Sequence, residues 1–172
     1  DRIVLLGTDR SEFGGSVYLR LLHGIEQGMP PAVDLDAEAR LALLLRQAIA
    51  GSAVHTAHDL SEGGLALALA ESCIGGVGSG NEGAAGLGAR IDVDLTPLDL
   101  FSETQGRALV AVAPARLERL MRLAEENGVP ALEVGEVGGT DLVIAADGAT
   151  LSAPVAQLHE IWSTALPKAL GF

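Results

Sequence analysis

Polar side chains and two adjacent glycines meet in the stretch Asp59-Leu60-Ser61-Glu62-Gly63-Gly64, between an expected strand and an expected helix. Backbone N–H groups at the start of a helix attract anions, and glycine lets a ligand come close to them. The pattern is compatible with a phosphate-binding turn, with Asp59, Ser61, Gly63 and Gly64 as candidate ligand contacts. The alternative is structural: Asp59 or Ser61 caps the helix, and the glycines only form the turn.

Residues 102–107 bring a second set of polar groups together, just before an apolar strand. They supply the carboxylate of Glu103, the hydroxyl of Thr104, the amide of Gln105 and the guanidinium of Arg107. This mixture suits a polyhydroxylated, phosphorylated ligand. The alternative is a solvated turn with an ion pair between Glu103 and Arg107, because the glycine after Gln105 is typical of turns.

A third polar segment, residues 9–16, also places glycines before an expected helix, with helix capping as the alternative to binding.

The sequence gives little support to other kinds of site. Lys168 is the single lysine and no G-x-x-x-x-G-K-[ST] motif is present, which excludes a P-loop. His55 and His58, three residues apart on a strand, point to opposite faces and disfavour a metal site. Cys73 has no basic neighbour that would lower its pKa, so we expect a buried thiol rather than a nucleophile.

Composition limits the class of protein further. The 172 residues suffice for one domain, and an apolar fraction of 48% excludes global disorder. The formal net charge of −12 repels phosphate backbones and anionic lipids, so we expect no nucleic-acid partner. No stretch reaches 18 uncharged residues, so we expect no membrane span. A single cysteine fits the reducing cytoplasm.

Hydrophobic periodicity predicts the elements that must position these residues. Helices are expected over 17–22, 37–50, 65–74, 114–126 and 155–165, with one helical turn over 96–100. Strands are expected over 3–6, 54–57, 89–93, 108–113, 132–137 and 142–146. Residues 75–88 contain seven glycines and predict a flexible loop. Because only some strands are apolar on both faces, the fold class expected is α/β (α+β), layered on a mixed sheet.

The order of the motifs resembles a known family. It comprises Glu12-Phe13-Gly14-Gly15-Ser16, then His58-Asp59-Leu60-Ser61-Glu62-Gly63-Gly64, then Leu100-Phe101-Ser102-Glu103-Thr104-Gln105-Gly106-Arg107, followed by a tail with Gly135-Glu136-Val137-Gly138-Gly139. Together they resemble the C-terminal domain of phosphoribosylformylglycinamidine synthase over essentially the whole chain. The His-Asp-Leu-Ser-Glu-Gly-Gly stretch is the most specific part and separates this chain from related synthetase domains.

The resemblance implies a three-layer domain of the aminoimidazole ribonucleotide synthetase superfamily with a mixed sheet. The family enzyme uses ATP, magnesium and glutamine-derived ammonia to convert formylglycinamide ribonucleotide into formylglycinamidine ribonucleotide in purine synthesis. Its catalytic histidine and its ATP and magnesium ligands lie on N-terminal-type domains, so no catalytic residue, metal or cofactor is expected in this chain. Partners implied are those domains and, in the small form of the enzyme, separate glutaminase and adaptor subunits.

For the site, the resemblance matches Glu103, Thr104 and Gln105 by position to a substrate-binding motif, with Arg107 as a phosphate contact. A relic of domain duplication is the alternative. The chain departs from the family pattern at Thr104, where serine is usual, and in the length of the loop at 75–88. Because it begins at Asp1 rather than methionine, we expect a piece of a longer protein.

Two functions remain open at this point. A binding site predicts that Glu103, Gln105 and Arg107 converge with residues 59–64 in one cleft. A non-catalytic scaffold predicts instead a sizeable exposed apolar patch, because the domain would then serve to present an interface.

Overall fold

The computed structural model describes residues 1–75 and 86–171, and β1 (Arg2–Leu6) lies in the interior of its sheet. The side chains of β1 alternate between two cores. Ile3 and Leu5 pack into one hydrophobic cluster, and Val4 and Leu6 pack into the other. Because both faces of this strand are buried, helices must cover the sheet on both sides.

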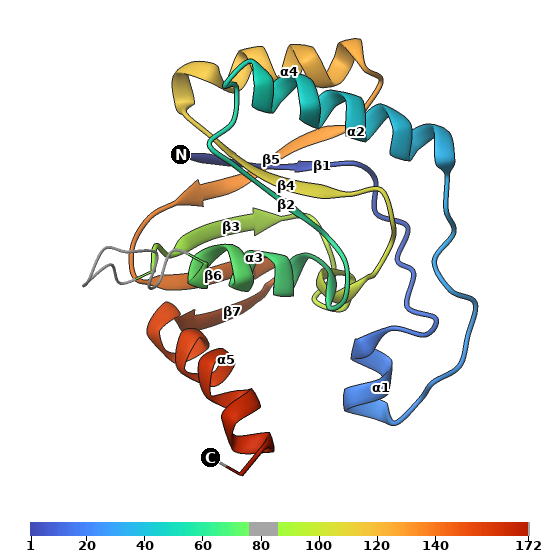
Figure 1. Ribbon diagram of the computed structural model, residues 1–172, viewed down its shortest axis with the longest axis vertical. Helices are drawn as coiled ribbons and strands as arrows, with labels where there is room; N and C mark the ends of the chain where they lie inside the picture. Colours follow the sequence, from blue (N-terminus) through green and yellow to red (C-terminus); the bar gives the residue numbers. More distant parts are fainter. Residues whose placement is uncertain (76–85, 172) are drawn as a thin grey trace.

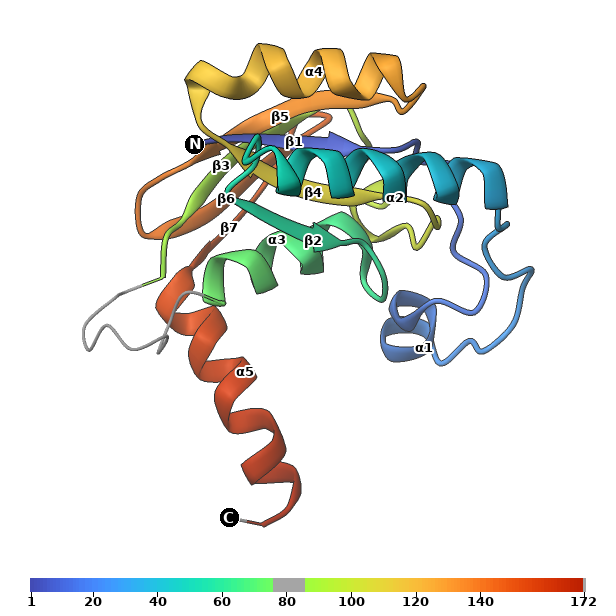
Figure 2. The ribbon, with the colours of Figure 1, turned by 45° about the horizontal axis from the view of Figure 1, so that its top comes forward.

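The helices do so in two pairs, as Figures 1 and 2 show. On one face lie α2 (Leu35–Ala50) and α4 (Leu117–Glu126), which contact each other. On the opposite face lie α3 (Gly64–Ile74) and α5 (Val155–Ala169). The short α1 (Val17–His23) stands apart from both layers on a long connection and has no buried residue (Figure 1). The expected three-layer α/β fold on a mixed sheet is therefore confirmed.

Seven strands form the sheet, in the order β2-β4-β1-β5-β3-β6-β7. Besides β1 they are β2 (Thr56–Asp59), β3 (Ala89–Val93), β4 (Ala108–Val112), β5 (Ala131–Val137), β6 (Asp141–Ala146) and β7 (Ala149–Pro154). All neighbouring strands pair antiparallel except β3 and β6, which run parallel. The short β2 is an edge strand, and its end leads directly into the turn before α3.

The main departure from the predicted elements is β7, which the periodicity did not predict. It follows β6 through a two-residue turn, Asp147-Gly148, in which both residues have positive φ. Such a turn favours a hairpin because its twist matches that of the strands. Much of β7 is exposed, so its sequence lacks the alternation of apolar residues that would predict a strand.

Smaller differences concern the ends of elements. The second strand is shifted to Thr56–Asp59, the last helix continues to Ala169, and the segment starting at Pro114 begins as a 3-10 turn before α4. A 3-10 turn at Asp99–Phe101 replaces the helical turn expected over 96–100. Of the predicted flexible loop at 75–88, residues 76–85 lie outside the described residues. Within the described ranges, no helix is long and apolar enough to span a membrane.

Candidate functional site

A cleft of about 450 Å³ lies between α2 and the edge strand β2. Its apolar wall comes from Leu41, Ala42 and Leu45 of α2, and its polar rim comes from both turns singled out by the sequence. Of the eight expected contact residues, the lining includes Asp59, Ser61, Gln105 and Arg107. The structure therefore brings the two turns together, although they are far apart in the chain.

Gly63 and Gly64 shape the first turn from behind the cleft. Both have positive φ, at 75° and 61°, which L side chains rarely adopt. A Cβ atom added at Gly64 would lie 2.3 Å from the carbonyl oxygen of Ser102. The second turn thus packs directly against the start of α3, and this close approach requires glycine.

Glu103 joins the same two segments through its side chain. Its Oε1 atom accepts hydrogen bonds from the backbone N–H of Gly63 and from that of Val17, each at 2.9 Å. Val17 is the first residue of α1 and Gly63 is the N-cap of α3. The Glu103 carboxylate therefore holds the starts of two helices, and the N–H group of Gly63 is already engaged.

Arg107 is equally committed to the protein interior. Its side chain has no exposed surface, its Nε donates to the carbonyl oxygen of Thr104 at 3.0 Å, and its Nη2 donates to that of Ser102 at 2.7 Å. Nη1 lies 3.4 Å from Oδ1 of Asp9. The alternative of a solvated turn with a Glu103–Arg107 ion pair is therefore wrong, because both residues are buried and Arg107 pairs with Asp9 instead.

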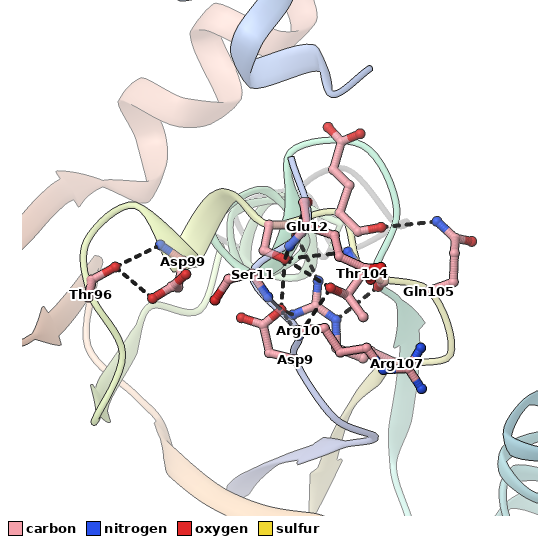
Figure 3. Close-up of polar contacts among 11 residues, drawn as sticks. Asp9, Arg10, Ser11, Glu12, Thr96, Asp99, Thr104, Gln105 and Arg107 are labelled. Carbon is pink, nitrogen blue, oxygen red and sulfur yellow. Dashed lines mark hydrogen bonds and ion pairs between the residues drawn. The ribbon is translucent and has the colours of Figure 1, made fainter. Parts of the chain in front are cut away.

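Burial has an electrostatic consequence for this guanidinium. Desolvation lowers the pKa of Arg107, and the nearby carboxylates of Asp9 and Glu12 act in the opposite direction. These two acidic residues come from the third polar segment, so the second and third segments meet in one network (Figure 3). The bond from the Gly63 N–H to Glu103 joins the first segment to it. Three buried atoms in it have no hydrogen-bond partner among the described residues: Oδ2 of Asp9, Oε2 of Glu12 and Nη1 of Arg107.

Ser102 and Thr104 complete the buried network. The Ser102 hydroxyl donates to Oδ1 of Asp9 at 2.7 Å and accepts from the backbone N–H of Glu12 at 3.1 Å. The Thr104 hydroxyl accepts from the backbone N–H of Arg10 at 3.2 Å. Both side chains are fully buried, so the hydroxyl of Thr104 serves the loop and does not reach the cleft.

Gln105 differs from its neighbours because it is exposed. Its Nε2 donates to the carbonyl oxygen of Glu103 at 3.1 Å, and it lies at the edge of the network in Figure 3. Together with Ser61 and Asp59, which are also exposed, it provides an amide, a hydroxyl and a carboxylate at the cleft. These groups can hydrogen bond to the hydroxyl and amide groups of a ligand.

The sequence did not assign partners to Asp9, Glu12 and Ser102, although they hold the network together. Ser102 stands 93 residues from Asp9 in the chain, and no local pattern signals a contact over that distance. The third segment was weighed as a helix cap, and Ser16 does accept a bond from the N–H of Leu19 as the N-cap of α1.

The other singled-out residues lie away from this cluster or at its margin. His55 contacts Asp1 at 2.7 Å, whereas Nε2 of His58 lies 3.5 Å from Glu71. In the described ranges, no three His, Cys, Asp or Glu residues are placed to hold a metal ion together. Cys73 is buried, and desolvation raises the pKa of its thiol to about 11, which opposes thiolate formation.

Comparison with known proteins assigns the chain to a class. Residues 1–147 match the family model described as AIR synthase related protein, C-terminal domain, and the chain belongs to this family.

Within that class, the similarity points to one enzyme subunit. Phosphoribosylformylglycinamidine synthase subunit PurL of Moorella thermoacetica is 42% identical over 171 residues, which cover 97% of this chain and 22% of that protein. The same subunit of Thermobifida fusca is 40% identical over 170 residues, covering 98% of this chain and 21% of that protein. The chain thus spans about a fifth of the length of these curated relatives.

Solved structures give the same fold. Thermotoga maritima PurL complexed with FGAR matches with a TM-score of 0.76 at 20% identity, covering 92% of this chain and 27% of that one. The hydrogenase maturation protein HypE in complex with ATP matches with a TM-score of 0.55 at 17% identity, covering 88% and 49%.

Proposed function

We propose that this chain works as the C-terminal domain of a phosphoribosylformylglycinamidine synthase. The whole enzyme would make formylglycinamidine ribonucleotide from formylglycinamide ribonucleotide, ATP and glutamine-derived ammonia in purine biosynthesis, in the cytoplasm. The observation that carries this proposal is the identity of about 40% with PurL proteins along nearly the entire chain.

Within that enzyme, we assign the cleft between α2 and β2 to binding part of the substrate. Gln105, Ser61 and Asp59 are exposed at its rim and would contact the ligand. The other candidate residues form the supporting wall: Glu103, Thr104, Arg107, Gly63 and Gly64. This division follows from burial, because a side chain whose polar atoms are already engaged in the interior has little left to offer a ligand.

ATP and magnesium would bind elsewhere in the full enzyme. Described residues do not fit a magnesium site, since no three potential ligands converge. The single arginine or lysine that lines the cleft is Arg107, which is buried and paired. We therefore place no reaction step on this chain. N-terminal-type synthetase domains, and glutaminase and adaptor subunits in the small form, would supply the remaining functions.

A scaffold role is the second candidate, and a separate observation favours it. Large apolar side chains are exposed on α1, where Leu21 and Leu22 are about two-thirds exposed, and on α5, where Trp162 and Leu166 are similarly exposed. Figure 2 shows α5 projecting away from the body of the molecule. Exposed apolar clusters of this kind are typical of interfaces, so these helices would contact neighbouring domains.

Isothermal titration of the full chain with formylglycinamide ribonucleotide separates the two roles. The binding role predicts measurable heat of binding. It also predicts that Gln105→Ala weakens the affinity for the ligand at least about tenfold. The matched control is Gln157→Ala, an exposed glutamine on α5 that should leave binding unchanged. Absence of heat from a chain with native circular dichroism would reject the binding role and leave the scaffold.

A further inference from the structure

An internal carboxylate lies where helices commonly receive an external anion. The start of α3 offers the backbone N–H of Gly63, and the partial positive charge of a helix N-terminus attracts negative groups. Oε1 of Glu103 occupies this position at 2.9 Å, and the same atom also accepts from Val17 at the start of α1. Glu103 as a whole residue is only 9% exposed, so this contact is shielded from solvent.

We propose that Glu103 is a built-in substitute for a bound anion, which fixes α1 to α3 and keeps external phosphate away from the Gly63-Gly64 turn. The role is independent of which ligand the cleft binds. It gives Glu103 a positioning function, because its carboxylate acts through two backbone N–H groups and not through contact with a ligand.

The surroundings of α1 explain why such a link is needed. No residue of α1 is buried, so apolar packing contributes little to its position. Its remaining contacts to the body include the ring of Tyr18, whose centroid lies 5.1 Å from that of Phe101. A carboxylate bonded to the first N–H of α1 therefore supplies an anchor that the hydrophobic core does not provide.

The charged groups that line the cleft also disfavour an external phosphate. Glu38 and Asp59 line it with carboxylates, and the Arg107 guanidinium is turned to Asp9 in the interior. With the Gly63 N–H also engaged, this part of the cleft disfavours phosphate. Ser61 and Gln105 are then positioned for the uncharged hydroxyl or amide groups of a ligand.

The test empties the carboxylate position and offers small anions in its place. In Glu103→Ala, we expect the Tm of the full chain to fall by about 6–10 °C, because two buried hydrogen bonds to a carboxylate are lost. Sodium formate should restore at least half of that loss, and inorganic phosphate should also raise the Tm. Sodium chloride at equal ionic strength should not. Wild type and the control Glu62→Ala, an exposed carboxylate beside the same turn, set the baseline for each salt.

Hydrogen exchange gives a second, residue-specific measurement, which also serves if Glu103→Ala fails to fold. The milder Glu103→Gln keeps an oxygen acceptor but loses the charge, so the amides of Val17 and Gly63 should exchange about tenfold faster together. Unchanged protection of either amide in Glu103→Gln overturns the proposal. So does a folded Glu103→Ala that formate stabilises no more than sodium chloride does.

Discussion

The turn at residues 102–107 and the turn at residues 59–62 border the same cleft, yet their environments are opposite. In the first, Ser102, Thr104 and Arg107 are at most 3% exposed, and each of them hydrogen bonds to other parts of the chain. In the second, Asp59, Ser61 and Glu62 are exposed. The difference teaches that the buried turn holds the architecture, whereas the exposed turn and Gln105 are free to meet a ligand.

The largest effect should come from removing the charge at the centre of the buried turn. Arg107→Met deletes both bonds to carbonyl groups and leaves Asp9 without its charged partner, which should lower the free energy of unfolding by about 3–5 kcal/mol. Urea denaturation of wild type and variant measures this loss of stability. Arg122→Met, which removes an exposed ion pair with Glu118, should cost no more than about 0.5 kcal/mol. Equal losses in the two variants would show that burial does not distinguish these arginines.

A smaller loss is expected where the two turns touch. Gly64→Ala places a Cβ against the Ser102 carbonyl at a positive φ, so the free energy of unfolding should fall by about 2–3 kcal/mol. The control is Gly138→Ala, where a Cβ meets no atom within 4 Å and φ is not positive. Its expected cost is about 0.5 kcal/mol. A tolerated Gly64→Ala would mean that the turns can separate.

The margin of the buried turn should respond to acid. Hydrogen bonds from the side chains of Ser11 and Thr96 lower the pKa of Asp99, from its ordinary value of 3.8. The ionised carboxylate therefore stabilises the fold above that value, and the contribution disappears as the pH falls through the lowered pKa. Because Asp99 is only partly buried, solvent screens this interaction and the effect should be about 0.5 kcal/mol.

Thermal unfolding between pH 6 and pH 3 checks this acid dependence. Asp99→Asn should lose less stability over that range than wild type does. The exposed Asp92→Asn on β3 serves as the matched variant. A wild-type acid dependence that persists unchanged in Asp99→Asn would contradict the assignment.

The smallest effect on stability should be found in the exposed turn. Ser61→Ala removes an exposed hydroxyl and should change the free energy of unfolding by less than about 0.5 kcal/mol. If the cleft binds formylglycinamide ribonucleotide, the same variant should still weaken that affinity, because a hydrogen bond to the ligand is lost. Differential scanning calorimetry and titration of one preparation measure both quantities. A large loss of stability would move Ser61 to the structural side of the comparison.

Local pattern was sufficient for most of the fold and insufficient for the roles within the site. Apolar runs located the buried strands, and apolar residues at helical spacing located the helices that became α2 to α5. The edge strand β7 was missed because an exposed strand needs no apolar alternation; its Asp-Gly turn was the available signal. Both polar turns were identified from residue type and spacing.

The direction of each polar side chain could not be obtained in this way. The residues next to Arg107 in the sequence do not tell whether its side chain faces a phosphate or Asp9. The direction of the side chain depends on Asp9, a partner far away in the chain. Glu103 likewise bonds to Val17 and Gly63, from two other segments. Contacts between distant segments decide the direction of such side chains, and a local window of sequence does not show those contacts.

The interior position of β1 has a consequence for the order in which the chain folds. β1 lies between β4 and β5, which begin at Ala108 and Ala131, so both edges of β1 stay unpaired until those later segments arrive. Pairings over such separations must overcome the entropy of closing long loops, which slows folding. During synthesis, the apolar Ile3-Val4-Leu5-Leu6 stretch is thus made before β4 and β5. It stays unpaired and prone to aggregation until these two strands are available.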